Sequence, residues 1–147
     1  MNKRLLGIPI LVIFPLCCFA LSNFNFTIYN KTSETSTLTV NSEKHGELHC
    51  NGKGYKTGDS FTIDANNSVS CSVTHENNHR NIYFTLTDNA DPKFRGALCQ
   101  FQVNNSGLVI YQDGTNPQSQ CFQDFCISEN TNLLIGIGQN SSSCTNE

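Results

Sequence analysis

The sequence contains no tryptophan, and its one methionine is Met1. Positive charge is also scarce: nine Lys and Arg residues stand against twelve Asp and Glu residues, and the cations are dispersed along the chain. Nucleic acids and acidic lipid surfaces are recognised by clustered Lys and Arg, so we expect neither kind of partner. The chain also contains no G-x-S-x-G motif and no pair of acids in a recognisable catalytic context. These absences favour a non-enzymatic protein, and the sequence indicates no cofactor for it.

The first 22 residues have the three parts of a secretory signal: two cations, a long apolar run, and small residues at Ala20 and Ser22. We expect cleavage after Ser22, which leaves a single domain of residues 23–147, with cleavage after Ala20 as the alternative. A membrane anchor fits less well because prolines interrupt the apolar run. Lipid attachment at Cys17 or Cys18 fits less well because no small residues precede them. The sequence therefore predicts a secreted or periplasmic protein that has no membrane span after signal removal.

Signal removal leaves seven cations against twelve carboxylates, a net charge of −5, and six cysteines. The cysteines are Cys50, Cys71, Cys99, Cys121, Cys126 and Cys144. An even number in an exported chain indicates a disulfide framework, and the spacing lacks the tight pairs of a zinc site. Bridges between cysteines that are near in sequence close most easily. We therefore favour the bridges Cys50–Cys71, Cys99–Cys121 and Cys126–Cys144. The rival is a bridge between Cys71 and Cys99 across two sheets.

Apolar and polar residues alternate with a period of two along most of the processed chain, which predicts β-strands with one buried face. Such runs lie at residues 24–29, 37–41, 61–64, 69–74, 82–87, 99–103 and 133–137. Turn-forming pairs such as Asn51-Gly52 separate the runs, and the segment at residues 104–107 predicts a hairpin. We expect an all-β fold, an antiparallel two-sheet sandwich of about eight to ten short strands that is stabilised by disulfides.

The segment His75-Glu76-Asn77-Asn78-His79 matches H-E-x-x-H and resembles the zinc-binding signature of metalloproteases, in which both histidines lie on one face of a helix. Here it lies between two alternating runs, and asparagine is a turn former and a weak helix former. We predict a polar hairpin loop, with a zinc hydrolase as the alternative. A three-residue loop would place both histidines on one face. A two-residue Asn77-Asn78 turn would pair Glu76 with His79 and turn the histidines apart.

Other segments offer weaker candidates for ion or phosphate binding. His45 and His49 form a second histidine pair, and two to four imidazoles could hold Zn²⁺ or Cu²⁺. The glycine-rich residues 52–58 superficially resemble a phosphate loop, but the required spacing and the following helix are absent. Three residues offer oxygens to Ca²⁺ without matching an EF-hand loop, so we predict a turn there. These residues are Asp88, Asn89 and Asp91.

Five asparagines lie in N-glycosylation sequons, which is no excess over chance in a chain with nineteen asparagines. They are Asn25, Asn30, Asn66, Asn104 and Asn140. The sequons therefore give no information about the source of the protein.

Exposed aromatic side chains can stack on sugars or anchor a protein partner. The four tyrosines fall on the polar side of runs or in a loop: Tyr29, Tyr55, Tyr83 and Tyr111. We treat Tyr29 and Tyr83 as candidate partner-binding residues. Phe122 and Phe125 lie between two cysteines and would be anchors if this segment were the rigid loop of an inhibitor. Burial of both rings beside the bridges is the alternative.

The sequence thus predicts an extracytoplasmic, non-enzymatic binding module that recognises a protein or a glycan. Two alternatives remain. One is an inhibitor of an extracytoplasmic enzyme, and the other is a zinc-binding protein or hydrolase that uses His75 and His79.

Overall fold

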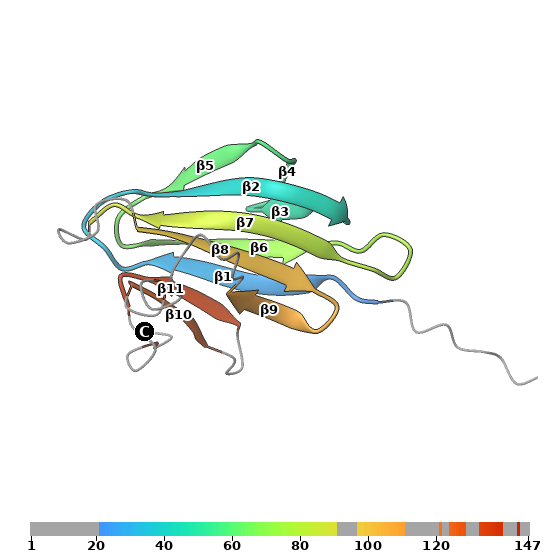
Figure 1. Cartoon of the computed structure of the whole chain (residues 1–147). Coiled ribbons are helices and arrows are strands. Elements are labelled where there is room, and N and C mark those ends of the chain that lie inside the picture. Colours follow the sequence, from blue (N-terminus) through green and yellow to red (C-terminus); the bar gives the residue numbers. More distant parts are fainter. Residues whose placement is uncertain are drawn as a thin grey trace, which may run out of the picture.

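The structure is a computed structural model that describes residues 21–90, 97–110, 121, 124–128, 133–139 and 144. These residues form two sheets that pack face to face, one of six strands and one of five (Figure 1). The predicted all-β two-sheet sandwich is therefore confirmed. Within the described ranges, no helix is both long and apolar enough to cross a membrane.

The order of strands within each sheet mixes segments from different parts of the chain. The six-stranded sheet contains, in spatial order, β10 (Phe125–Ser128), β11 (Leu134–Ile137), β1 (Phe24–Asn30), β6 (Asn67–Val73), β3 (Leu48–Cys50) and β4 (Lys53–Tyr55). The five-stranded sheet contains β5 (Ser60–Ile63), β2 (Ser36–His45), β7 (Asn81–Asp88), β8 (Ala97–Asn104) and β9 (Gly107–Ile110). The eleven strands exceed the expected number because β3 and β4 have three residues each, which is too short for an alternation to be recognised.

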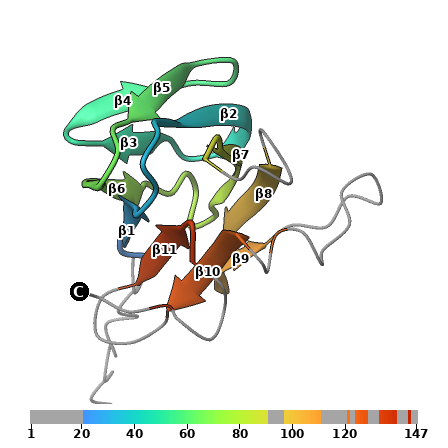
Figure 2. The same cartoon turned by 90° about the vertical axis from the view of Figure 1, so that its left-hand side faces the viewer.

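One strand pair departs from the predicted antiparallel arrangement. β1 pairs with β11 in parallel, with Thr27 opposite Leu134 and Ile28 opposite Ile135. Figure 2 views the sandwich from one end and shows β10 and β11 beside β1. All four residues of β11 are buried, as is common for parallel strands that are covered on both faces. Among the described strands, the last in sequence therefore pairs with the first, and β10 lies outside it at the edge of the sheet.

Phenylalanine rings from both sheets form a continuous series of contacts across the core. Phe26 stacks on Phe84 with ring centroids 5.8 Å apart, and Phe84 stacks on Phe101 at 5.5 Å. Phe101 then meets the edge of Phe125 at 5.9 Å. Such pairs contribute about 0.5–1.5 kcal/mol beyond the area that they bury. The rings therefore join the two layers at the centre of the sandwich.

The structure forms three disulfides, and they are the favoured pairs: Cys50–Cys71, Cys99–Cys121 and Cys126–Cys144. The rival bridge between the sheets does not form, because Cys71 lies directly opposite Cys50 on the neighbouring strand. Their Cα atoms are 4.1 Å apart. Of the six bridged cysteines, all except Cys144 are buried. Three disulfides in a domain of this size indicate an oxidising, extracytoplasmic environment.

Candidate functional site

The H-E-x-x-H segment lies in the connection between β6 and β7, which belong to different sheets, and its tip forms a tight turn closed by an isolated β-bridge. Glu76 and His79 exchange backbone hydrogen bonds of 2.8 and 2.9 Å. Between them, Asn77 and Asn78 have φ angles of 52° and 61°. Two central residues with positive φ are typical of a type I′ turn, and asparagine tolerates this conformation better than most residues. The predicted polar loop is therefore present in its two-residue form.

This hairpin does not bring His75 and His79 together as a pair of metal ligands. Successive residues of an extended strand point to opposite faces, so the Glu76–His79 pairing turns His75 away from His79. Nδ1 of His75 is buried and has no hydrogen-bond partner among the described residues. His79 is exposed and contacts the ring of His45. The turn therefore does not place His75 and His79 on one face, and it does not provide the helix that a metalloprotease mechanism requires.

The glycine-rich segment at residues 52–58 contains turns and does not form a phosphate loop. Asn51 and Gly52, with φ angles of 49° and 78°, form the turn between β3 and β4. A second turn follows, in which the Lys56 N–H donates to a carboxylate oxygen of Asp59 at 2.9 Å. The backbone N–H groups of this segment are therefore distributed over two separate turns.

The candidate calcium residues also begin a turn. Oδ1 of Asp88 accepts a hydrogen bond from the Ala90 N–H at 2.9 Å, and Nδ2 of Asn89 donates to the Thr35 carbonyl at 2.6 Å. Asp91 lies outside the described residues. Within the described part of the chain, no group of three or more His, Cys, Asp or Glu side chains is arranged to hold a metal ion.

The candidate aromatic residues do not form one surface. Tyr29 projects from the outer face of the six-stranded sheet, whereas Tyr83 lies on the outer face of the other sheet, where its hydroxyl accepts a 2.9 Å hydrogen bond from Gln102. Tyr55, which we expected on a polar surface, is buried and packs against Phe61. The two candidate tyrosines therefore belong to separate surfaces, and a role of either one in partner binding stays a prediction.

The segment proposed as an inhibitory loop is only partly described. Phe125 is wholly buried and belongs to the core, so its assignment as an exposed anchor is wrong. Its burial agrees with the alternative interpretation of a ring packed beside the disulfides. Phe122 lies outside the described residues.

An open groove of about 360 Å³ lies on the outer face of the six-stranded sheet. Its polar side chains come from neighbouring strands: Asn25 and Thr27 from β1, Ser70 and Ser72 from β6, and His49 from β3. In register, Asn25 and His49 lie on either side of Ser72, and Thr27 lies opposite Ser70. The hollow exists because the side chains at its centre are small. Leu133 provides an apolar surface at its border.

His49 is the one ionisable side chain among the described residues that line the groove. Its Nε2 lies 3.3 Å from a carboxylate oxygen of Glu47, and the two side chains are 33% and 53% exposed. An ion pair with this exposure contributes little to stability. The ring lies over Gly54, at which an added Cβ would be 3.4 Å from Cε1 of His49. The absence of a side chain at Gly54 therefore leaves room for the imidazole beside the groove.

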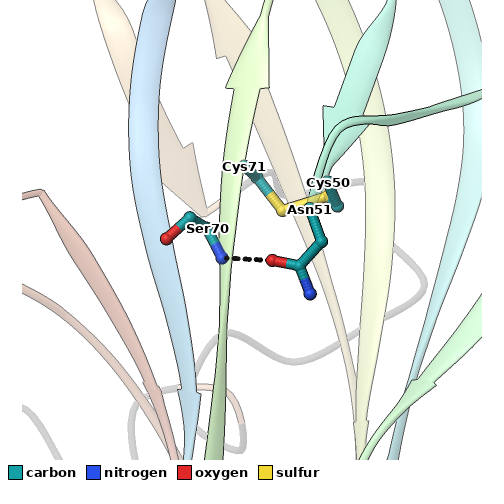
Figure 3. The surroundings of a disulfide bond; sticks show 4 residues. All are labelled: Cys50, Asn51, Ser70 and Cys71. Atoms are coloured by element: carbon teal, nitrogen blue, oxygen red, sulfur yellow. Dashed lines mark hydrogen bonds between the residues drawn. A yellow bond between two sulfur atoms is a disulfide. The ribbon is translucent and has the colours of Figure 1, made fainter.

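The framework beneath the groove is covalently fixed. The Cys50–Cys71 disulfide joins β3 to β6, as Figure 3 shows. Beside it, the Asn51 N–H donates to the Ser70 carbonyl at 2.9 Å. Oδ1 of Asn51 also accepts a hydrogen bond from the Ser70 N–H at 3.3 Å, which Figure 3 shows as a dashed line. These two bonds extend the strand pairing by one residue. Side chains on such a rigid element are held in place more firmly than side chains on a loop.

Sequence reasoning did not identify this groove, although one signal for it was present. Ser68, Ser70 and Ser72 alternate with three apolar residues, so β6 presents only serines on its outer face. The contribution of β1 became visible only with the strand register, which places Asn25 and Thr27 beside these serines. The alternation within a strand does not specify which distant strand it pairs with, or in which register.

The structure also distinguishes the glycosylation sequons. Asn30 is fully buried, and its Nδ2 donates to backbone carbonyls of Glu34 and Ile63 at 2.8 and 3.0 Å. The nitrogen that would carry a glycan is therefore inaccessible in the folded chain. Asn25 and Asn66 are exposed, and Asn104 is partly exposed. Asn140 lies outside the described residues.

Comparisons with known proteins do not assign the chain to a family. No protein-family model matches it, and no curated protein matches it significantly. The geometry of the chain itself therefore has to indicate the function. Among the features described above, the groove gathers the most polar side chains around one accessible hollow.

Proposed function

We propose that this protein is an extracytoplasmic binding module that recognises a glycan through the groove on its six-stranded sheet. The observation that carries this proposal is the gathering of five polar side chains around one open hollow. Hydroxyl and amide groups both donate and accept hydrogen bonds, as recognition of a polyhydroxylated ligand requires. Tight protein–protein sites usually centre on Trp, Tyr or Arg anchors. None of these residue types is among the described residues that line the groove.

The hydroxyl groups of the groove are available to a ligand. Those of Thr27, Ser70 and Ser72 make no hydrogen bond to another residue in the described ranges. Tyr29 follows Thr27 on the same face of β1 and lies opposite Ser68, so it extends the polar face beyond the groove. Nζ of Lys31 lies 5.3 Å from the centroid of this ring, so the aromatic group next to the hydroxyl groups is partly covered by a cation.

Filling the centre of the groove should weaken recognition strongly. Ser70 is exposed, so Ser70→Phe places a large ring in the hollow without disturbing the core. We expect the affinity for any glycan identified on an array to fall at least about tenfold, which corresponds to about 1.4 kcal/mol. Titration calorimetry with the isolated oligosaccharide would measure this change.

Val109→Phe is the matched control, because Val109 is 41% exposed on the outer face of the other sheet. We expect this variant to bind the oligosaccharide as the wild type does. An array that yields no glycan, or a Ser70→Phe variant that retains full affinity, would contradict the proposal.

The proposal also includes export, and a contact of Arg80 bears on the position of signal cleavage. Arg80 is buried, and burial lowers the pKa of its guanidinium group. Its Nη1 donates to the Ser22 carbonyl at 2.9 Å, and the guanidinium lies 5.0 Å from the ring centroid of Phe24. Cleavage after Ala20 retains this carbonyl. Cleavage after Ser22 removes it and brings a new ammonium group toward a buried cation, which is unfavourable.

We therefore now favour the alternative cleavage site, after Ala20, over the site after Ser22, and expect the processed chain to begin at Leu21. Intact mass spectrometry of the secreted protein, before and after reduction, should show this start together with three disulfides. A mature chain that begins at Asn23 would contradict the role assigned to the Arg80 contact. An unprocessed chain would contradict export by a cleavable signal.

A further inference from the structure

Two histidines meet at a corner of the molecule that is separate from the groove. His45 is the last residue of β2, His79 follows the Asn77-Asn78 turn, and both side chains are exposed. Their ring centroids are 5.8 Å apart, and the ring planes are inclined by 49°. In Figure 1 the loop between β6 and β7 projects at the end of the sandwich where β2 ends. Two imidazoles from distant parts of the chain thus face solvent side by side.

Main-chain contacts hold the two segments together. The Thr74 N–H donates to the Glu47 carbonyl at 3.0 Å, and Oγ1 of Thr74 accepts from the Glu47 N–H at 2.8 Å. Between these segments, Gly46 has a φ of 92°, and a Cβ at this position would collide with the Thr74 carbonyl. The backbone therefore fixes how closely the two histidine-bearing segments approach.

We propose that His45 and His79 form a binding site for a divalent transition metal ion, with Zn²⁺ as the ion to test. A zinc ion about 2.0–2.1 Å from one nitrogen of each ring, at a tetrahedral angle, would set the ring centroids about 5 Å apart. The observed separation of the centroids, 5.8 Å, is close to this value. Among the described residues no third ligand is in place, so water completes the coordination.

Asn105 determines which ring nitrogen of His79 is available to bind a metal ion. Its Oδ1 accepts a hydrogen bond from the Arg80 N–H at 2.9 Å, so its Nδ2 is the group that faces Nδ1 of His79 at 3.3 Å. An amide donor at Nδ1 places the proton of the neutral ring on Nε2. For Nε2 to bind a metal ion, this proton must move to Nδ1 and the contact with Asn105 must break. A long, exposed hydrogen bond of this kind opposes metal binding only weakly.

The substitution Asn105→Asp should strengthen metal binding by His45 and His79. In Asn105→Asp, one carboxylate oxygen still accepts from the Arg80 N–H, and the other can accept the Nδ1–H of His79. A carboxylate behind a ligating histidine typically changes metal affinity about 10- to 100-fold. In titration calorimetry of the chelator-treated full protein with ZnCl₂ near pH 7.5, we expect Asn105→Asp to bind about tenfold more tightly than the wild type. Asn78→Asp is the matched control, because it adds the same charge next to His79 without facing Nδ1. Its expected change is less than about threefold.

Replacing either histidine completes the test. Circular dichroism would confirm that each variant is folded. His45→Ala and His79→Ala should each weaken Zn²⁺ binding at least about tenfold, and His49→Ala should leave it unchanged. The site is independent of glycan binding, so failure of one proposal leaves the other standing. The metal site is overturned if the wild type binds no Zn²⁺, or if His49→Ala weakens binding as much as His45→Ala. It is also overturned if Asn105→Asp binds no more tightly than Asn78→Asp.

Discussion

Replacing Phe84 with alanine should lower the free energy of unfolding by about 3–5 kcal/mol. Phe84 is wholly buried and lies between Phe26 and Phe101 in the series of rings that crosses the core. The substitution removes both ring contacts and leaves a cavity between the two sheets. Because domains of this size unfold with about 5–15 kcal/mol, the loss is a large fraction of the total stability. Urea denaturation of the oxidised protein would measure it as a fall in the midpoint at constant slope.

Val109→Ala provides the comparison, since Val109 is 41% exposed. Its expected effect is within about 0.5 kcal/mol, as for most surface substitutions. A loss below about 1 kcal/mol in Phe84→Ala would mean that the ring contacts do not join the sheets in solution.

Asn30→Ala should be destabilising by about 2–4 kcal/mol, although it changes a polar residue into a good core residue. The Nδ2 group of Asn30 donates to carbonyls of three residues, the farthest being Asp64 at 3.2 Å. Its Oδ1 accepts from the N–H and the Oγ1 of Thr32 at 3.1 and 2.7 Å. Alanine makes none of these bonds, and the partners that remain buried lose their hydrogen bonds without gaining water. Denaturant unfolding would again give the magnitude.

Two further variants identify the source of that loss. Asn25→Ala, at an exposed position on the same strand, should change stability by less than about 0.5 kcal/mol. Asn30→Asp keeps the acceptor atoms but sets a carboxylate against three carbonyl oxygens, so it should also be strongly destabilising. Wild-type stability in Asn30→Asp would show that the donated hydrogen bonds are not important.

The sequence predicted the sandwich because its strands face the core on one side and solvent on the other. Val69, Cys71 and Val73 alternate with serines, and all three are buried as their spacing requires. The favoured disulfides followed from loop closure and were formed as expected. The parallel pairing of Ile28 with Ile135 was not predictable, because it joins residues more than a hundred positions apart and neither strand specifies its neighbour.

The contact between His45 and His79 shows a second limit on what alternation in the sequence can predict. Two bulges interrupt β2, between Val40 and Ser42 and between Glu43 and His45. Each bulge shifts the alternation by one residue, so counting from Val40 gives the wrong face for Glu43. Glu43 instead lies opposite Ile82, which is wholly buried, and its Oε2 is buried as well. Only the folded pairing reveals that His45 contacts His79 and that His75 does not.

The order of the disulfides has a consequence for how the protein can be produced. Each bridge joins a cysteine to the next one along the folded domain, with separations of 21, 22 and 18 residues. When such a chain enters an oxidising compartment from its N-terminal end, each thiol meets its native partner before the following pair arrives. Oxidation by thiol–disulfide exchange can then give the native set directly, without reshuffling. An expression host that supplies a thiol oxidase, with no disulfide isomerase, should be sufficient to make the correctly bonded protein.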